Sequence, residues 1–473
     1  MNGNCSTTGC KSPERLPDAA ALEQQWKSID WKKAEAEVNR LQARIAKATQ
    51  EKKWNTVKRL QYLLTHSYYA KVLAVRKVTT NKGKKTPGVD GELWSTPAAK
   101  MRGVLTLTDK GYKAKPLRRV FIEKKGKKAK RPLGIPCMYD RAMQALYALA
   151  LDPVSETTAD TKSFGFRKGR CAQDACEYIF TALSRSFSPQ WVLEGDIKGC
   201  FDHISHDWLI EHIPMDKSVL KQFLKAGFIF EQELFPTDEG APQGGVISPI
   251  LANMALDGMQ KVLSDRFDLS AKGEVSAFVH NKSKVNLVRY ADDFIVTAAT
   301  KEIAEEAKAI IRDFLQTRGL ELSEEKTVIT HIDDGFDMLG WTFRKFKGKL
   351  IVKPSKKALK ALKSALSETI LGRGKAWKQE VLIEKLNQQI RGWTNYHQSV
   401  CASDAFAHID YILYELLWRW AKRRHPHKGQ WWVSTNYWHR RGNRNWVFCT
   451  EGKELLRVDH IPIVRHTKVR MDA

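Results

Sequence analysis

The chain has 473 residues, and its 79 lysines and arginines against 53 aspartates and glutamates give a formal net charge of +26. With 42% hydrophobic residues and 15 tryptophans it has ample apolar surface to bury, which excludes a wholly disordered chain. The charge excess predicts a polyanionic partner, usually nucleic acid, and the lack of any apolar run of about 18 residues excludes a membrane-spanning helix.

The first third of the sequence predicts helices followed by a pair of strands. Residues 1–20 are rich in small and polar residues and indicate a flexible arm. Helix-like spacing of apolar residues runs from Ala21 to Lys77. Residues 118–122 and 131–135 then predict two short strands around a lysine-rich turn. Arg141 to Leu151 predicts a buried helix that stops before Pro153.

The middle of the chain alternates strands and helices. Residues 191–196 predict a strand, and helices are expected from His206 onward and over 248–263. Residues 285–297 predict a hairpin, and 303–319 an amphipathic helix ended by glycine. Strands continue to Val352 and helices dominate from Ser355, so we expect a domain boundary near residue 353.

The sharpest local feature is a pair of adjacent acids in the expected hairpin, at Tyr290-Ala-Asp-Asp-Phe294. Two carboxylates between apolar strands repel each other unless they bind cations, and paired divalent ions held by carboxylates are typical of nucleotidyl transfer. Such a site needs a third acid from a neighbouring strand, and Asp196 ends one. The alternative is an ordinary turn, since Asp is a common turn residue. The apolar hairpin, the basic chain and the upstream acid favour the metal site.

An ordered set of further motifs accompanies these acids. In chain order they are Arg131-Pro-Leu-Gly-Ile-Pro136, Ser163-Phe-Gly-Phe-Arg167, Asp196-Ile-Lys-Gly-Cys-Phe-Asp202, Pro242-Gln-Gly-Gly-Val-Ile-Ser-Pro249, Leu322-Ser-Glu-Glu-Lys-Thr327, Phe336-Asp-Met-Leu-Gly-Trp341 and Arg391-Gly-Trp-Thr-Asn-Tyr396. This set resembles the bacterial group II intron-encoded reverse transcriptases and maturases. Because the chain stops at Ala473, the resemblance is to members without a C-terminal HNH endonuclease domain.

The resemblance implies an α+β right-hand polymerase, with fingers, a palm built on an antiparallel sheet, and an α-helical thumb or maturase domain. The implied divisions are an arm at 1–20, a helical extension and the start of the fingers at 21–110, fingers and palm at 111–352, the thumb at 353–425 and a basic DNA-binding-like segment at 426–473.

The resemblance also implies roles for individual residues. Asp196, Asp292 and Asp293 match the acids that hold two Mg²⁺ ions, for which Mn²⁺ is a possible substitute. Lys326 matches a lysine that protonates departing pyrophosphate, and a solvated lysine beside Glu324 and Glu325 is an equal alternative. The residues that match dNTP-binding positions are Lys124, Arg131, Phe201, Gln243 and Gly244, with Phe201 under the sugar and Lys124 and Arg131 at the triphosphate.

The C-terminal region interleaves aromatic and basic residues, a pattern that suits stacking on RNA together with phosphate contact. For Trp393, Trp418 and Trp420 we favour a place in the helical core. The arginines that we expect to bind nucleic acid are Arg419, Arg423, Arg424, Arg440, Arg441 and Arg444.

Two groups of metal-ligand residue types attract attention. Cys200, His203 and His206 recur every three residues, and Cys171 precedes Cys176 by five. Neither has a second ligand pair at zinc spacing, so we expect structural roles for both.

These observations predict an RNA-directed DNA polymerase that uses dNTPs on an RNA template with a DNA primer, and that also binds structured intron RNA as a splicing maturase. Alternatives are a protein that is mainly an RNA-binding maturase, and a host-domesticated relative used in DNA repair or defence. With no signal peptide and scattered cysteines, we expect a cytoplasmic bacterial protein, associated with the nucleoid through nucleic acid.

Overall fold

The structure, a computed structural model, describes residues 17–123, 130–242 and 244–467. Helices and strands both contribute, so the expected α+β class is confirmed. The chain forms two compact units, each assembled from separate stretches of sequence. The first unit comprises Met1–Thr161, Ile197–Met259 and Arg312–Leu322, and the second comprises Lys162–Asp196, Gln260–Ile311 and Ser323–Ala473. Among the described residues, no helix is both long and apolar enough to cross a bilayer.

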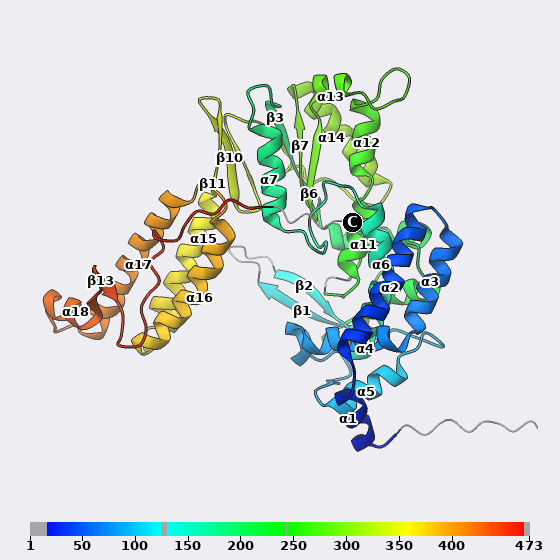
Figure 1. The fold of residues 1–473 in the computed structure, drawn as a ribbon, viewed down its shortest axis with the longest axis horizontal. Helices are drawn as coiled ribbons and strands as arrows, with labels where there is room; N and C mark the ends of the chain where they lie inside the picture. The colour runs from blue at the N-terminus through cyan, green and yellow to red at the C-terminus, as the bar shows by residue number, and fades with distance from the viewer. Residues whose placement is uncertain (1–16, 124–129, 243, 468–473) are drawn as a thin grey trace, which may run out of the picture. The chain divides into compact units, whose positions relative to one another are not determined.

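The first unit is mostly helical (Figure 1). The helical prediction for residues 21–77 is confirmed, and the segment forms four helices. The second begins where the Asp30 side chain accepts the Lys33 N–H at 3.0 Å. The helices described in this unit are α1 (Ala19–Lys27), α2 (Trp31–Gln50), α3 (Trp54–His66), α4 (Tyr68–Thr80), α5 (Pro97–Thr106), α6 (Met138–Thr158), α8 (Cys200–His203), α9 (His206–His212), α10 (Lys217–Leu224) and α11 (Ser248–Leu256), with a 3-10 turn at Lys82–Lys85.

The expected end of a helix before Pro153 is wrong, because α6 continues to Thr158 with the proline inside it. Proline has no N–H to donate to the carbonyl four residues earlier, which is that of Leu149. The side chain of Gln42, in α2, donates to this carbonyl at 2.7 Å. The hydrogen-bond donor that the Leu149 carbonyl lacks inside α6 is therefore supplied by a neighbouring helix. Sequence periodicity does not reveal this contact.

The sheet of the first unit has the order β2-β1-β4-β5. The strands predicted over 118–122 and 131–135 are confirmed as β1 (Leu117–Glu123) and β2 (Lys130–Ile135), which pair antiparallel. The lysine-rich turn between them lies outside the described residues. Two short strands, β4 (Phe228–Phe230) and β5 (Glu233–Phe235), complete the sheet, with β4 parallel to β1.

The second unit contains an antiparallel sheet in the order β6-β7-β3-β8 (Figure 1). The predicted strand and hairpin are confirmed as β3 (Trp191–Asp196), β6 (Asn286–Tyr290) and β7 (Asp293–Ala298), joined by β8 (Val328–His331). The backbone of residues 162–164 pairs along the free edge of β6, through two hydrogen bonds of 2.9 Å with Arg289. Helix α7 (Ala172–Leu183) packs on the sheet, with its buried face in the same apolar cluster as Val192, Val288 and Ile295.

Three more helices fall in the middle of the chain, α12 (Met259–Phe267), α13 (Ala277–Ser283) and α14 (Lys301–Gln316). The single helix expected over 248–263 is wrong, because the chain breaks between α11 and α12 at Gly258, whose φ of +97° lies in the left-handed region. The amphipathic helix is confirmed as α14, and Gly319 follows it with a φ of +73°.

A three-stranded meander leads into the C-terminal helices. Its strands are β9 (Phe336–Met338), β10 (Trp341–Phe346) and β11 (Lys349–Pro354). After them come α15 (Lys356–Ser367), a π-helical turn (Glu368–Arg373), α16 (Gln379–His397), α17 (Ser403–Arg424), α18 (Gln430–Tyr437) and the hairpin β12 (Trp438–Arg441) with β13 (Arg444–Phe448).

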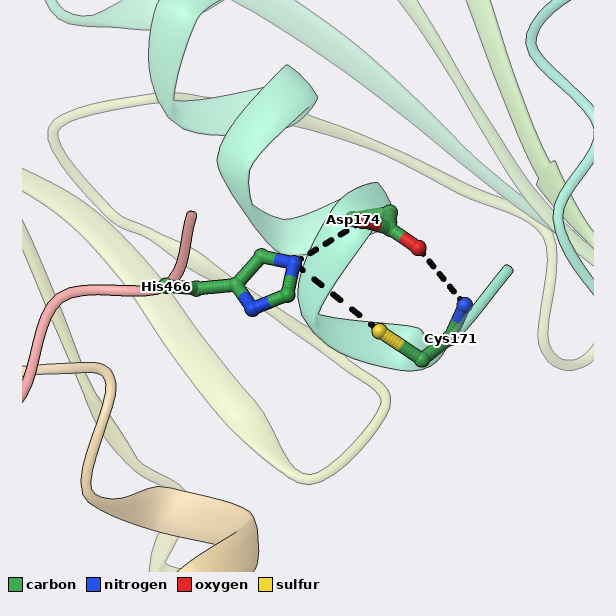
Figure 2. Close-up of side chains that lie close together, drawn as sticks. All are labelled: Cys171, Asp174 and His466. Carbon is green, nitrogen blue, oxygen red and sulfur yellow. Dashed lines mark hydrogen bonds and ion pairs between the residues drawn. The ribbon is translucent and has the colours of Figure 1, made fainter. Parts of the chain in front are cut away.

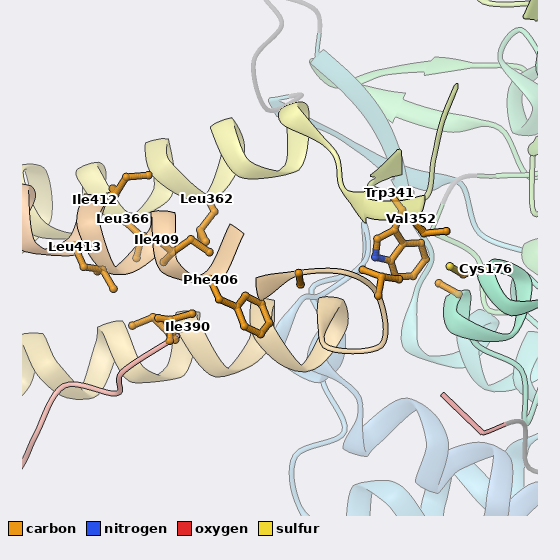
Figure 3. Packing of buried hydrophobic residues seen from close by; sticks show 14 of the residues in the cluster. Cys176, Trp341, Val352, Leu362, Leu366, Ile390, Phe406, Ile409, Ile412 and Leu413 are labelled. Carbon is orange, nitrogen blue, oxygen red and sulfur yellow. The ribbon is translucent and has the colours of Figure 1, made fainter. Parts of the chain in front are cut away.

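One apolar cluster joins the meander to these helices (Figure 3). Trp341 is fully buried and stacks on Tyr396 with ring centroids 4.7 Å apart. Trp420 is also in this core, and Trp393 and Trp418 pack against it half-buried, so the core placement favoured for these three rings is confirmed. The cluster runs across residue 353, and the boundary expected there stays a prediction.

Candidate active site

Two aspartates face each other at one end of the sheet in the second unit. Asp196 is the last residue of β3, Asp293 is the first residue of β7, and the antiparallel register pairs them directly. Directly opposed residues project from the same face of a sheet, and like charges in such a pair are destabilising. Asp292 precedes Asp293 in the turn of the hairpin. The fold therefore brings acids from two separate stretches of chain to one sheet end.

The hairpin tip that carries these acids has an unusual backbone. Tyr290 pairs with Asp293, so Ala291 and Asp292 form a two-residue loop. Ala291 has a φ of +59°, in the region that usually calls for glycine at the first position of such a loop. Gly165 closes over it, because a Cβ on Gly165 would lie 2.4 Å from the Ala291 nitrogen. A strained tip held by a backbone contact is typical of functional sites.

The electrostatics of the tip are those of crowded like charges. Withdrawal from water, followed by repulsion from Asp292 and Asp196, raises the pKa of Asp293 to about 6. Its side chain nonetheless keeps access to solvent. In the part of the chain that the structure describes, the carboxylate oxygens of the three aspartates do not all lie within 4.8 Å of one another. Repulsion between the three charges favours this separation. Mg²⁺ takes oxygen ligands and would relieve this repulsion, so the donor set fits a divalent cation.

Lys326 is held beside Asp196 by a tight turn. The Ser323 N–H donates to the Asp196 carbonyl at 2.8 Å, and the Lys326 N–H donates back to the Ser323 carbonyl at 3.0 Å. The Lys326 ammonium forms an ion pair with the Asp196 carboxylate while 54% of its side chain stays exposed. Glu324 pairs instead with Lys308 at 2.7 Å. An exposed pair of this kind contributes about 0–1 kcal/mol, so it leaves the lysine free to change partners.

Of the residues expected to bind dNTP, Phe201 and Gly244 lie in one region of the first unit. Phe201 is half-buried in α8, and its carbonyl accepts the Ala241 N–H at 2.7 Å. Gly244 lies against β2, because a Cβ there would lie 2.7 Å from the Gly134 carbonyl, and its φ is +112°. The backbone of Arg131 pairs with Ile122 in the same β1–β2 hairpin. Lys124 and Gln243 lie outside the described residues.

The six C-terminal arginines fall into two groups. Arg424 donates to the Trp377 carbonyl at 2.9 Å, Arg441 to the Thr450 carbonyl at 2.5 Å, and Arg440 to the Gly442 carbonyl at 3.2 Å. Arg444 forms an ion pair with Glu454, in which one guanidinium nitrogen, Nη2, donates to both carboxylate oxygens at 2.9 and 3.1 Å. In the described part of the chain, Arg419 and Arg423 form no hydrogen bond or ion pair.

Arg419 lines a hollow with aromatic side chains. Its walls include Trp431 and Trp446, which are 78% and 61% exposed. Aromatic faces beside an arginine suit stacking on nucleobases.

Sequence reasoning missed two residues around the acids. Gly165 lies within a recognised motif, but nothing in the sequence shows that it touches the hairpin tip. Lys357 of α15 acts on Asp293 by lowering its pKa against the larger raising effects. It is an ordinary lysine in a basic helix, and no local pattern singles it out.

Comparisons with known proteins match three successive regions of the chain. Residues 26–107 match the N-terminal domain of reverse transcriptase, 122–343 match reverse transcriptase (RNA-dependent DNA polymerase), and 359–438 match the maturase-specific domain of group II introns. Protein YkfC of Escherichia coli (strain K12) is 32% identical over 319 residues, which cover 60% of this chain and 82% of YkfC.

The chain belongs to the group II intron reverse transcriptase/maturase family. The resemblance recognised in the sequence motifs is thereby confirmed. The group II intron-encoded protein LtrA of Lactococcus lactis subsp. cremoris is also 32% identical, over 359 residues covering 64% of this chain. The chain spans 59% of the length of LtrA. A putative COX1/OXI3 intron 1 protein of Saccharomyces cerevisiae is 29% identical over 307 residues, which cover 55% of this chain and 36% of that protein. All three aspartates lie within the reverse transcriptase match of this family.

Proposed function

We propose that the protein is an RNA-directed DNA polymerase, which copies an RNA template into cDNA by extending a DNA primer with dNTPs. The observation that carries this proposal is the pairing of Asp196 with Asp293, with Asp292 beside them, inside the reverse transcriptase match. Family membership alone would allow a chain that had lost its chemistry, whereas an assembled acidic pair argues for a working site.

Asp196, Asp292 and Asp293 would hold two Mg²⁺ ions, or Mn²⁺ in their place. When bound, the metal would supply activation of the primer 3′-hydroxyl and neutralisation of charge on the departing pyrophosphate. Lys326 is placed to give a proton to the leaving pyrophosphate, because its ammonium already lies against Asp196.

The polymerase reading gives each part of the fold a role. The sheet β6-β7-β3-β8 would be the palm, the β1–β2 hairpin would belong to the fingers, and helices α15 to α17 would form the thumb. By the sequence resemblance, Phe201 would lie beneath the sugar of the incoming nucleotide, Gly244 would belong to the loop that cradles the nucleotide, and Arg131 would contact its triphosphate. The roles of Lys124 and Gln243 follow from the sequence resemblance alone.

A second function is favoured by the maturase-specific match at residues 359–438. We propose that helices α15 to α17 and the following segment bind structured intron RNA and assist its splicing. The basic, aromatic surface near Arg419 supports this role, because stacking and phosphate contact are the usual means of binding folded RNA. The three aspartates lie outside the maturase-specific match, so the two functions are compatible.

Primer extension with the Asp292→Ala protein separates the two functions. We expect cDNA synthesis to be abolished while affinity for intron RNA stays within about twofold, because the acids contribute to chemistry and not to RNA contact. Asp404→Ala is the matched control for primer extension, since this aspartate is 85% exposed on α17 and, among the described residues, pairs with Lys353. Near-normal extension by Asp292→Ala would overturn the metal-site assignment.

A further inference from the structure

Three side chains of different chemistry converge in the second unit, apart from the aspartates of the active site (Figure 2). Cys171 and Asp174 lie at the start of α7, and His466 comes from the C-terminal segment. The His466 Nε2 lies 2.8 Å from the Asp174 Oδ1 and 3.9 Å from the Cys171 Sγ. Among the described residues, these three form the group of three or more histidines, cysteines, aspartates or glutamates whose ligand atoms all lie within 4.8 Å of one another.

The backbone fixes two of the three side chains. The second carboxylate oxygen of Asp174 accepts the Cys171 N–H at 2.7 Å, as in a capping box at the first turn of the helix. Asp174 is only 6% exposed, so its remaining oxygen is held toward His466 in a buried position. Both ligand atoms on α7 are thus pre-positioned by the helix start.

The third side chain is delivered by a segment that returns from the far end of the C-terminal helices. After β13 the chain runs back along α16 and α17 toward α7 (Figure 1). The Val464 N–H donates to the Gln398 carbonyl at 3.0 Å, just before His466. A carboxylate and a thiol on one helix therefore meet an imidazole almost three hundred residues later in the sequence.

The geometry excludes a nucleophilic triad. In such a triad the acid binds one imidazole nitrogen and the nucleophile binds the other. Here the single Nε2 atom faces both the carboxylate and the sulfur. Convergence of all three groups on one point is instead the arrangement of metal ligands.

We propose that Cys171, Asp174 and His466 bind one Zn²⁺ ion, with water as the fourth ligand. Sulfur, imidazole nitrogen and carboxylate oxygen are all zinc ligands, and three protein ligands with one water is a common zinc set. Standard zinc bond lengths place neighbouring ligand atoms roughly 3.5 Å apart in a tetrahedron. The distances from the His466 Nε2 to the Asp174 Oδ1 and to the Cys171 Sγ lie below and above this value. Side-chain movements of less than about 1 Å would therefore complete the site.

Binding would deprotonate the Cys171 thiol, and the released proton would pass to solvent. The mixed set discriminates against Mg²⁺, which takes oxygen ligands, so the two kinds of site would not compete for the same ion. A bound Zn²⁺ would fasten the C-terminal segment to α7, and with it the chain that follows the maturase-specific match.

Cobalt substitution tests the proposal on the full chain. Co²⁺ is added to metal-free protein in excess Mg²⁺, which occupies the carboxylate site. We expect one equivalent of Co²⁺ to produce a thiolate-to-cobalt charge-transfer band in the near ultraviolet, and Zn²⁺ to displace it. Cys171→Ser should abolish the band, whereas Cys401→Ser should keep it, because Cys401 is a free, exposed cysteine outside the cluster.

Conservative variants separate a metal site from a structural contact. Asp174→Asn keeps an oxygen for the cap hydrogen bond but loses the charge, and we expect at least tenfold weaker Co²⁺ binding. His466→Ala should also weaken binding at least tenfold. Zn²⁺ should slow tryptic cleavage after Arg465 in the wild type and not in Cys171→Ser. No charge-transfer band in the wild type, or a band that survives Cys171→Ser or His466→Ala, would overturn the proposal.

Discussion

Asp196 and Asp293 are cross-strand partners at the end of β3 and β7, and Asp292 adds a third carboxylate one residue away. The arrangement costs stability in the folded protein, since each charge opposes the others. At this hairpin the carboxylates required for activity lower the stability of the folded protein. Substitutions that remove a charge there should therefore raise stability and lower activity.

Asp293→Asn should stabilise the metal-free protein while abolishing cDNA synthesis. Burial, and then repulsion from Asp292 and Asp196, raise the pKa of Asp293 to about 6. Removing the charge of Asp293 therefore relieves this repulsion. Because solvent reaches the side chain, we expect a gain of no more than about 1 kcal/mol in the free energy of unfolding. Thermal unfolding in chelator and in Mg²⁺ measures this. Mg²⁺ should raise the melting temperature of the wild type and leave that of the variant unchanged; a variant less stable in chelator would contradict the repulsion.

Gly165→Ala should damage the site from outside the acids. The added Cβ would lie 2.4 Å from the Ala291 nitrogen, and a backbone atom at a hairpin tip cannot move aside cheaply. We expect at least a tenfold loss of primer extension and a destabilisation of about 1–3 kcal/mol. Gly429→Ala is the matched control, because an added Cβ there meets nothing within 4 Å. Equal activity of the two variants would show that the tip does not depend on this contact.

The strands around these acids could be predicted because their signals are local. Apolar runs that end in an acid mark β3 and the β6–β7 hairpin, and a two-residue loop fixes the register within the hairpin. The pairing of β3 with β7 is not local. It was expected because a metal site needs a third acid from a neighbouring strand, and Asp196 ends one. Pro153 shows the limit of local rules, because the partner that keeps α6 intact comes from Gln42 on another helix.

Long-range side-chain contacts also could not be predicted from the sequence, because they join residues that lie far apart along the chain. Cys171 was set beside Cys176 by spacing, whereas the fold sets it beside His466. Arg424 looked like a nucleic-acid contact because it lies in a basic run, yet its guanidinium bonds to a backbone carbonyl in the same unit. Charge patterns predict which part of the surface is basic. Only the fold shows which of its basic side chains are bonded within the protein and which are available to bind nucleic acid.

Burial of His397 predicts acid sensitivity. The ring is 2% exposed, lies beside Trp341 and Trp393, and its pKa is lowered by burial to about 4 from an ordinary 6.5. Between these values the unfolded chain binds a proton that the folded chain does not, so stability falls as pH falls. The histidine should account for a loss of about 2 kcal/mol between pH 7 and pH 5. Chemical unfolding of wild type and His397→Phe at both pH values measures it, and an equal loss in both proteins would contradict the assignment.

Arg423 and Arg424 should behave differently although they are neighbours on α17. Arg423 forms no hydrogen bond or ion pair among the described residues, so Arg423→Ala should weaken intron RNA binding and reduce its log–log salt slope by about one unit. Arg424 donates to Trp377 and lies over the Trp420 ring at 4.6 Å. Arg424→Ala should instead lower the free energy of unfolding by about 1 kcal/mol and leave the salt slope unchanged. RNA titrations at several salt concentrations, with unfolding curves, distinguish the two. The same slope change in both variants would mean that both arginines reach phosphate.

Phe201→Val should relax the choice of sugar. Phe201 follows Asp196 by five residues, and the Ala241 N–H donates to its carbonyl, which ties α8 to the chain at Ala241. If the ring lies beneath the incoming sugar, a ribose 2′-hydroxyl must share its space and lose water without gaining a partner, a penalty of about 1–3 kcal/mol. The variant should raise kcat/KM for rNTPs by about tenfold to a few hundredfold and change dNTP use little.

The control for this substitution is Phe223→Val, in α10 of the same unit, where the ring is 2% exposed and packs in the core. That change should lower thermal stability and leave the ratio of dGTP to GTP incorporation as it is in the wild type. Single-nucleotide incorporation by the three proteins measures both effects. If Phe201→Val lowers both rates together, with an unchanged ratio and a lower melting temperature, then Phe201 is a core residue and the preference for deoxynucleotides must come from elsewhere in the site.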